Sequence, residues 1–97
     1  MSDNVQRHLA VCNEMNVLYA YKDNDYGGSF HHSYIEEGMA MVRIRLGDKF
    51  NRFKQLTKNP ESQLVKGESI RDTLIDLANY AVMAVMEIDH EAQHEKI

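Results

Sequence analysis

Residues 68–88 constrain the fold most, because their sequence predicts one long helix with two faces of opposite character. Apolar residues recur at alternating steps of four and three, which places them on one continuous stripe of such a helix. This predicted stripe comprises Ile70, Leu74, Leu77, Ala81, Ala84 and Ile88. A separate polar line recurs at steps of four, four and three and comprises Glu68, Asp72, Asp76 and Asn79.

The acidic line needs a cationic partner, because carboxylates along one helix face repel each other. One candidate is a hard metal ion such as Mg²⁺, which prefers carboxylate oxygens. The other is the basic face of a neighbouring helix. Such a face is formed by Arg45, Asp48, Lys49 and Arg52, which fall at i, i+3, i+4 and i+7. Two alternatives for these four charges are a solvated surface ladder and the binding of phosphate oxygens by the arginines.

The chain of 97 residues predicts a single all-α domain that spans residues 1–97. We expect three helices, near residues 3–21, 36–56 and 69–90, with a glycine- and tyrosine-rich loop at 22–34. Three short helices bury little apolar area, although 43% of the residues are hydrophobic. We therefore expect a helical bundle that is completed by a homo-oligomer.

The ends of the predicted helices follow from local sequence signals. Ser2 or Asp3 can cap the first helix, the acids Glu36 and Glu37 suit the start of the second, and Ser69 suits the cap of the third. The polar residues after Ile88 predict a fraying tail. The apolar line of the first helix is Val5, Leu9, Cys12, Met15 and Tyr19, and the predicted buried line of the second is Met39, Val42, Leu46, Phe50, Phe53 and Leu56. Gly47, inside the second helix, suggests close packing against a neighbour.

Residues 22–34 combine turn-forming residues with aromatic rings and a lysine. Tyr26 or Phe30 would stack on a base, while Lys22 and the backbone amides would approach phosphate. The alternative is a plain connector between helices, in which the rings cover the core. The candidate residues in and next to this loop are Lys22, Asp25, Tyr26, Gly27, Ser29 and Phe30.

Composition and short motifs exclude several functions. The net charge of −4 and the pI near 5.7 argue against binding to duplex DNA or to an anionic membrane. The single Cys12 and the lack of a signal peptide or long apolar run predict a cytoplasmic protein. The segment from His90 to His94 has the H-E-x-x-H spacing of zinc hydrolases, but only three residues follow it, so we interpret it as coincidence.

Three segments, KDNDYGGSF, VRIRLGDKFNRF and ESIRDTLIDLANYAVM, resemble the signature blocks of a bacteriophage and bacterial family, the nucleotide modification associated domain of type one. The blocks span most of residues 21–86 in matching order. This resemblance implies a small helical phage-type protein of nucleotide or modified-base metabolism, located in the cytoplasm of the bacterial host.

A more distant similarity is to the all-α nucleoside triphosphate pyrophosphohydrolases of the MazG kind. Those enzymes resemble this chain in architecture and place acids from two packed helices around magnesium. Their usual pattern is Glu-Glu-x-x-Glu followed later by Glu-x-x-Asp. This chain departs from it, because Ala40 stands where the third glutamate is expected after Glu36 and Glu37, and the later acids are spaced four apart.

Three functional hypotheses follow from these observations. The first is a magnesium-dependent nucleotide hydrolase, with Asp48, Glu68, Asp72 and Asp76 as the metal ligands. The second is a non-catalytic protein that sequesters a modified nucleotide or a cyclic or ADP-ribose-type signal of host defence. The third is an interaction module whose charges form salt bridges between helices. Besides the loop candidates, the expected nucleotide-binding residues are Arg45, Lys49, Arg52, Asn79 and Tyr80.

Overall fold

The chain folds into helices alone over the part that the structure, a computed structural model, describes. That part is residues 2–22, 28–59 and 66–95, with the backbone only at 66–69 and 94–95. The helices are α1 (Asp3–Tyr21), α2 (Ser29–Glu37), α3 (Met39–Lys58) and α4 (Lys66–Glu95). The all-α class is confirmed, whereas the expectation of three helices is wrong, because α2 is an additional helix. No described helix has the length and apolarity that crossing a bilayer requires.

The helix α2 occupies a segment for which the sequence predicts partly loop and partly the start of a longer helix. Gly38, with φ 64° and ψ −146°, separates α2 from α3 in a backbone conformation that a right-handed helix cannot contain. The amide of Gly38 donates to the carbonyl of Tyr34 at 2.8 Å and so closes α2. The charge of Glu36 and Glu37 suggests that they open a helix, but the two residues end α2.

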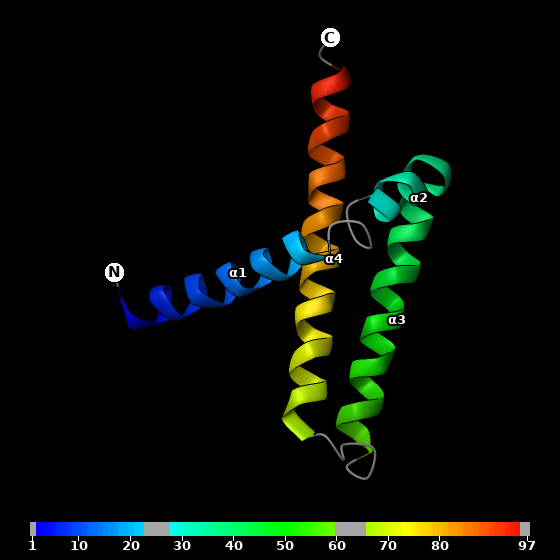
Figure 1. Ribbon diagram of the computed structural model, residues 1–97. Helices are drawn as coiled ribbons and strands as arrows, with labels where there is room; N and C mark the ends of the chain where they lie inside the picture. The colour runs from blue at the N-terminus through cyan, green and yellow to red at the C-terminus, as the bar shows by residue number, and fades with distance from the viewer. Residues whose placement is uncertain (1, 23–27, 60–65, 96–97) are drawn as a thin grey trace.

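Helices α3 and α4 run antiparallel and side by side, and α2 lies at the upper end of α3 in Figure 1, while α4 extends further up. The core forms where these three helices meet and consists of Phe30, Tyr34, Met41, Val42, Met83 and Ala84. Tyr19, Leu46 and Tyr80 pack against it. The predicted buried line of the middle helix is correct at Val42 and Leu56 but wrong at Met39 and Phe50, which are 40% and 48% exposed.

The face of α4 that packs against the other helices carries polar residues as well as apolar ones. Thr73, Asn79 and Glu87 are buried, whereas Leu74 and Ile88 of the predicted apolar stripe are exposed. One cause of the burial of Glu87 is its contact with His31. The carboxylate of Glu87 lies within hydrogen-bond distance of Nδ1 of His31, and this contact joins α2 to α4. The helix itself is turned so that much of its apolar stripe faces solvent.

The ends of α1 and α4 differ in part from the local signals. The hydroxyl of Ser2 accepts from the amide of Val5 at 3.2 Å, which confirms the cap of α1. Ser69 lies inside α4, so its expected role as the cap is wrong. Helix α4 continues to Glu95, beyond the expected end near residue 90.

Helix α1 projects sideways from the middle of α4, which it meets with its C-terminal end, as Figure 1 shows. None of its residues is buried, and Val5 and Leu9 on its apolar line are each about half exposed. An isolated helix of this length is only marginally stable in water. The contacts at its C-terminal end are therefore what hold α1 in place.

We expect Gly38→Ala to lower the free energy of unfolding by about 1–3 kcal/mol, because the φ of Gly38 is one that alanine adopts only with strain. Urea melts at fixed protein concentration measure the change.

The matched control is Gly47→Ala. A Cβ at Gly47 would meet nothing within 4 Å, so the close packing inferred from this glycine is wrong. Here alanine removes backbone entropy from the unfolded chain, and stability should rise by about 0.5–1 kcal/mol. Equal effects of the two substitutions would contradict the backbone explanation.

Candidate functional site

A cavity of about 650 Å³ lies between the C-terminal half of α1 and the first part of α4. This volume is within the usual range of small-molecule sites, which is about 300–1,000 Å³. We call it the α1–α4 cavity, and its lining residues are Glu14, Val17, Leu18, Tyr21, Lys22, Asp72, Ile75 and Asp76. The carboxylates and the lysine lie among apolar side chains, which is the composition of a site for a charged ligand with an apolar part.

Helical spacing explains why these residues share one cavity. On α1, Glu14, Leu18 and Tyr21 recur at steps of four and three, so they lie on one face. On α4, Asp72 and Asp76 are one helical turn apart. Because α1 crosses α4, these two faces meet.

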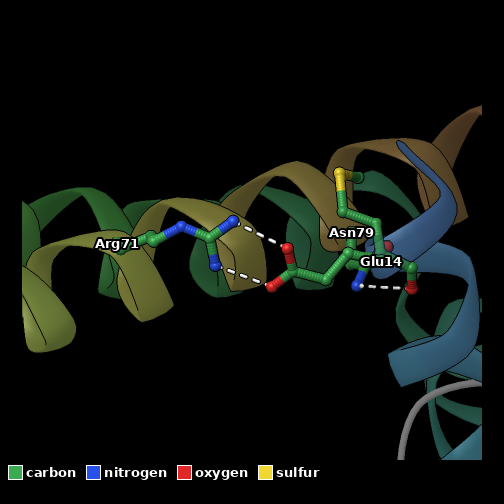
Figure 2. Close-up of polar contacts among 4 residues, drawn as sticks. Glu14, Arg71 and Asn79 are labelled. Carbon is green, nitrogen blue, oxygen red and sulfur yellow. Dashed lines mark hydrogen bonds and ion pairs between the residues drawn. The ribbon is translucent and has the colours of Figure 1, made fainter. Parts of the chain in front are cut away.

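A two-pronged ion pair holds α1 in its crossing position, as Figure 2 shows. Arg71 donates from Nη1 to Oε2 of Glu14 at 2.6 Å and from Nη2 to Oε1 at 2.7 Å. Such a bidentate arginine–carboxylate pair fixes the orientation of both groups. Both side chains are about half exposed, so solvent screens the attraction.

A second contact in Figure 2 joins α4 to the backbone of α1. Nδ2 of Asn79 donates to the carbonyl of Met15 at 3.4 Å, and Asn79 is buried. A buried amide needs hydrogen-bond partners, because an unpaired polar group inside the protein is destabilising. Asn79, expected to contact a nucleotide, therefore positions the wall of the cavity.

One member of the acidic line meets the basic face of α3. Nζ of Lys49 lies 3.3 Å from Oδ2 of Asp76 and 5.9 Å from the centroid of the Tyr80 ring. Both charged side chains are about a quarter to a third exposed. At Asp76, the cationic partner that the acidic line requires is thus a neighbouring helix.

The structure brings together several of the residues that the sequence proposes. Lys22, Asp72 and Asp76 line the α1–α4 cavity, and Lys49 contacts Asp76 from α3. Tyr80 lies behind this contact and packs against Phe30, with ring centroids 5.9 Å apart.

Other candidates lie elsewhere. Arg45 and Asp48 line a separate cavity of about 370 Å³ on α3, together with Glu37 and Ile44. Arg52 and Ser29 are exposed, on α3 and at the start of α2.

The aromatic loop is described only in part. Phe30 is 3% exposed inside the core, which favours the connector interpretation for this ring over base stacking. Asp25, Tyr26 and Gly27 lie outside the described residues, and so does the side chain of Glu68.

The carboxylates that were expected to bind metal do not converge among the described side chains. No three or more histidine, cysteine or acidic residues among these side chains are placed to hold a metal ion. Asp72 and Asp76 share one cavity, whereas Asp48 lies at the other. Of the predicted metal ligands whose side chains the structure describes, Asp72 and Asp76 therefore lie together and Asp48 lies apart.

Sequence reasoning missed two polar contacts that join distant segments. Glu14 and Arg71 are 57 positions apart, and His31 and Glu87 are 56 apart. Periodicity identifies residues on the same helix face but carries no information about which distant charges meet. The cluster at His31 extends to His90, whose ring stacks on it at 5.7 Å.

Comparison with known proteins gives one match. Residues 22–88, more than half of the chain, match the family described as Nucleotide modification associated domain 1. The chain belongs to this family. The matched segment includes Lys22, Lys49, Asp72 and Asp76, and the family description provides a context of nucleotide metabolism. No curated protein and no solved structure matches the chain.

We expect the attachment of α1 to weaken in acid. The hydrogen bond from Arg71 lowers the pKa of Glu14 below its ordinary value. A carboxyl with a lowered pKa in the folded state contributes stability above its unfolded pKa, and this contribution is lost as the pH falls. Amide NMR signals of α1 should therefore shift on titration from neutral pH to about pH 3.

Glu14→Gln and Arg71→Gln should each remove most of this pH dependence. Arg43→Gln, at an exposed arginine on α3, should leave it unchanged. An unaltered titration in Glu14→Gln would show that another group controls α1.

Proposed function

We propose that the protein binds a nucleotide in the α1–α4 cavity, with the phosphates near Lys22 and a Mg²⁺ ion between them and the carboxylates of Asp72 and Asp76. The observation that carries this proposal is that one lysine and two acids of the matched family segment line a single cavity, although they are far apart in sequence. Lys22 and the aspartates come from opposite walls.

The charges of the cavity explain why the ligand should arrive with a cation. Nucleotide phosphates are anionic, and Asp72, Asp76 and Glu14 line the same cavity, so direct contact would be repulsive. Mg²⁺ is commonly held by one or two carboxylates together with substrate phosphates. Asp72 is exposed and Asp76 is partly exposed one turn further along, so this pair of oxygen donors fits that requirement.

The apolar part of the cavity suits the base. Val17, Leu18 and Ile75 contribute its apolar lining, and Tyr21 is 89% exposed at its edge, where its ring is accessible for stacking. The residues after Lys22 remain candidates for contact with the ligand. Those of the loop are Asp25, Tyr26 and Gly27, and the next described candidate is Ser29.

Nucleotide pyrophosphohydrolysis is the reaction that we assign to this arrangement. When bound, Mg²⁺ would neutralise charge on the phosphates and lower the pKa of a coordinated water. The side chains of the cavity have the roles of holding and orienting: Asp72 and Asp76 hold the cation, Lys22 offsets phosphate charge, and Lys49 keeps Asp76 in place.

Binding without chemistry is a second candidate, favoured by the contact between Lys49 and Asp76. An aspartate already paired with a lysine has less need of a metal ion, because one positive charge is in place. In this second function the protein would sequester a modified nucleotide or a cyclic or ADP-ribose-type signal, and binding would persist in EDTA.

Calorimetry with canonical and modified deoxynucleoside triphosphates, in Mg²⁺ and in EDTA, tests both functions. Asp72→Asn should weaken binding in Mg²⁺ at least about tenfold, because removal of a charged ligand contact costs roughly 1.5–3 kcal/mol. An assay of pyrophosphate release then shows whether a bond is broken.

Asp48→Asn is the matched control, because it makes the same chemical change at the separate cavity on α3. It should bind nucleotide like the unmodified protein. Thermal melts of each variant separate loss of binding from loss of folding. Absence of binding to every nucleotide tested would overturn the proposal and leave the interaction module.

A further inference from the structure

The outward face of α4 carries an apolar stripe that no described helix covers. We define this outward stripe as Leu74, Ala78, Ala81, Val85 and Ile88. Leu74, Val85 and Ile88 are 43%, 55% and 46% exposed. Two other sides of α4 are occupied, since Asn79 contacts α1 and Met83 and Ala84 belong to the core with α2 and α3. Val82 and Met86, beside the stripe, are also about half exposed.

The spacing of the outward stripe is that of a helix–helix seam. Its residues recur at steps of four, three, four and three, which is the heptad pattern of coiled coils. The two central residues are alanines, which allow two helix backbones to approach closely, and larger residues lie at both ends. This is the arrangement of a surface that packs against another helix along its length.

The chain exposes more surface than a compact monomer of its size, which leaves room for a further contact. The chain exposes 7210 Å², whereas a compact monomer of 11.2 kDa exposes about 5,700 Å². The radius of gyration of 15.5 Å is also larger than the ~12.5 Å expected for this length. The excess of about 1,500 Å² includes the surface of α1, none of whose residues is buried, and is larger than the ~800 Å² per partner that a standard stable interface removes.

We propose that a second copy of this chain packs its own outward stripe against this one, with the two α4 helices antiparallel. A two-fold pairing covers both exposed stripes at once. Arg71 and Asp89 flank the stripe at opposite ends, and their separation of eighteen residues is five helical turns, so both lie on the same flank. Antiparallel pairing places each Arg71, whose guanidinium also pairs with Glu14 of its own chain, on the same side of the seam as Asp89 of the other copy. In a parallel pair, residues of one flank lie on opposite sides of the seam, so these two charges would not meet.

This dimer goes beyond the proposed function and stands on different residues. The stripe residues do not line the α1–α4 cavity. Failure of nucleotide binding therefore leaves the dimer intact, and a monomeric protein leaves the nucleotide proposal open.

Sedimentation equilibrium of the full chain at tens of micromolar should give twice 11.2 kDa. Val85→Glu should raise the dimer dissociation constant at least about a hundredfold, because pairing would bury a carboxylate in an apolar seam. Val85 is exposed within one chain, so the helical circular dichroism spectrum should be retained. The matched control is Ile44→Glu on α3, which is 63% exposed and should leave the dimer intact.

Mixing two variants tests the antiparallel register. In an antiparallel pair centred near residue 80, Leu74 of one copy faces Val85 of the other. The variants Leu74→Lys and Val85→Glu should therefore each be monomeric when studied alone. Mixed together they should form a heterodimer, because the new lysine and glutamate meet once and the native Leu74 and Val85 meet once. A monomeric unmodified protein, a dimeric Val85→Glu, a monomeric Ile44→Glu or a mixture that stays monomeric would overturn the proposal.

Discussion

The structure depends on how α4 is rotated about its own axis. The side of α4 that meets the other helices includes the polar residues Thr73, Asp76, Asn79 and Glu87, and each of them has a partner or is part of the packed interior. Buried polar groups are tolerated only when they are hydrogen-bonded or paired. This rotation produces the α1–α4 cavity and also leaves an apolar stripe facing outward.

Helix α1 shows the consequence of this rotation for the rest of the chain. Because it meets polar positions on α4, specific bonds attach it: the ion pair between Glu14 and Arg71 and the amide of Asn79. Such bonds fix an orientation well but contribute little stability when exposed. The same bonds place Glu14 and Lys22 opposite the aspartates, so the cavity and the attachment of α1 have one physical origin.

The candidate site could be predicted in part. The spacing of Asp72 and Asp76 by one helical turn places them on one face, and the charge of that face indicates a cationic partner. The choice of Lys49 as the partner of Asp76, and the separation of Asp48 into another cavity, could not be predicted. Both depend on the angle and register at which α3 meets α4, which ridge packing allows in several forms.

The sequence alone determined the helical class, the start of the first helix at Ser2 or Asp3 and the grouping of residues on common helix faces, because these follow from periodicity and local hydrogen bonding. It could not show that Gly38 ends an additional helix in the expected loop and precedes the start of the next, since a glycine inside a helical pattern is also compatible with an unbroken helix. Tertiary structure alone decided which face of α4 turns inward, because that choice sums contacts from α1, α2 and α3, segments distant in sequence.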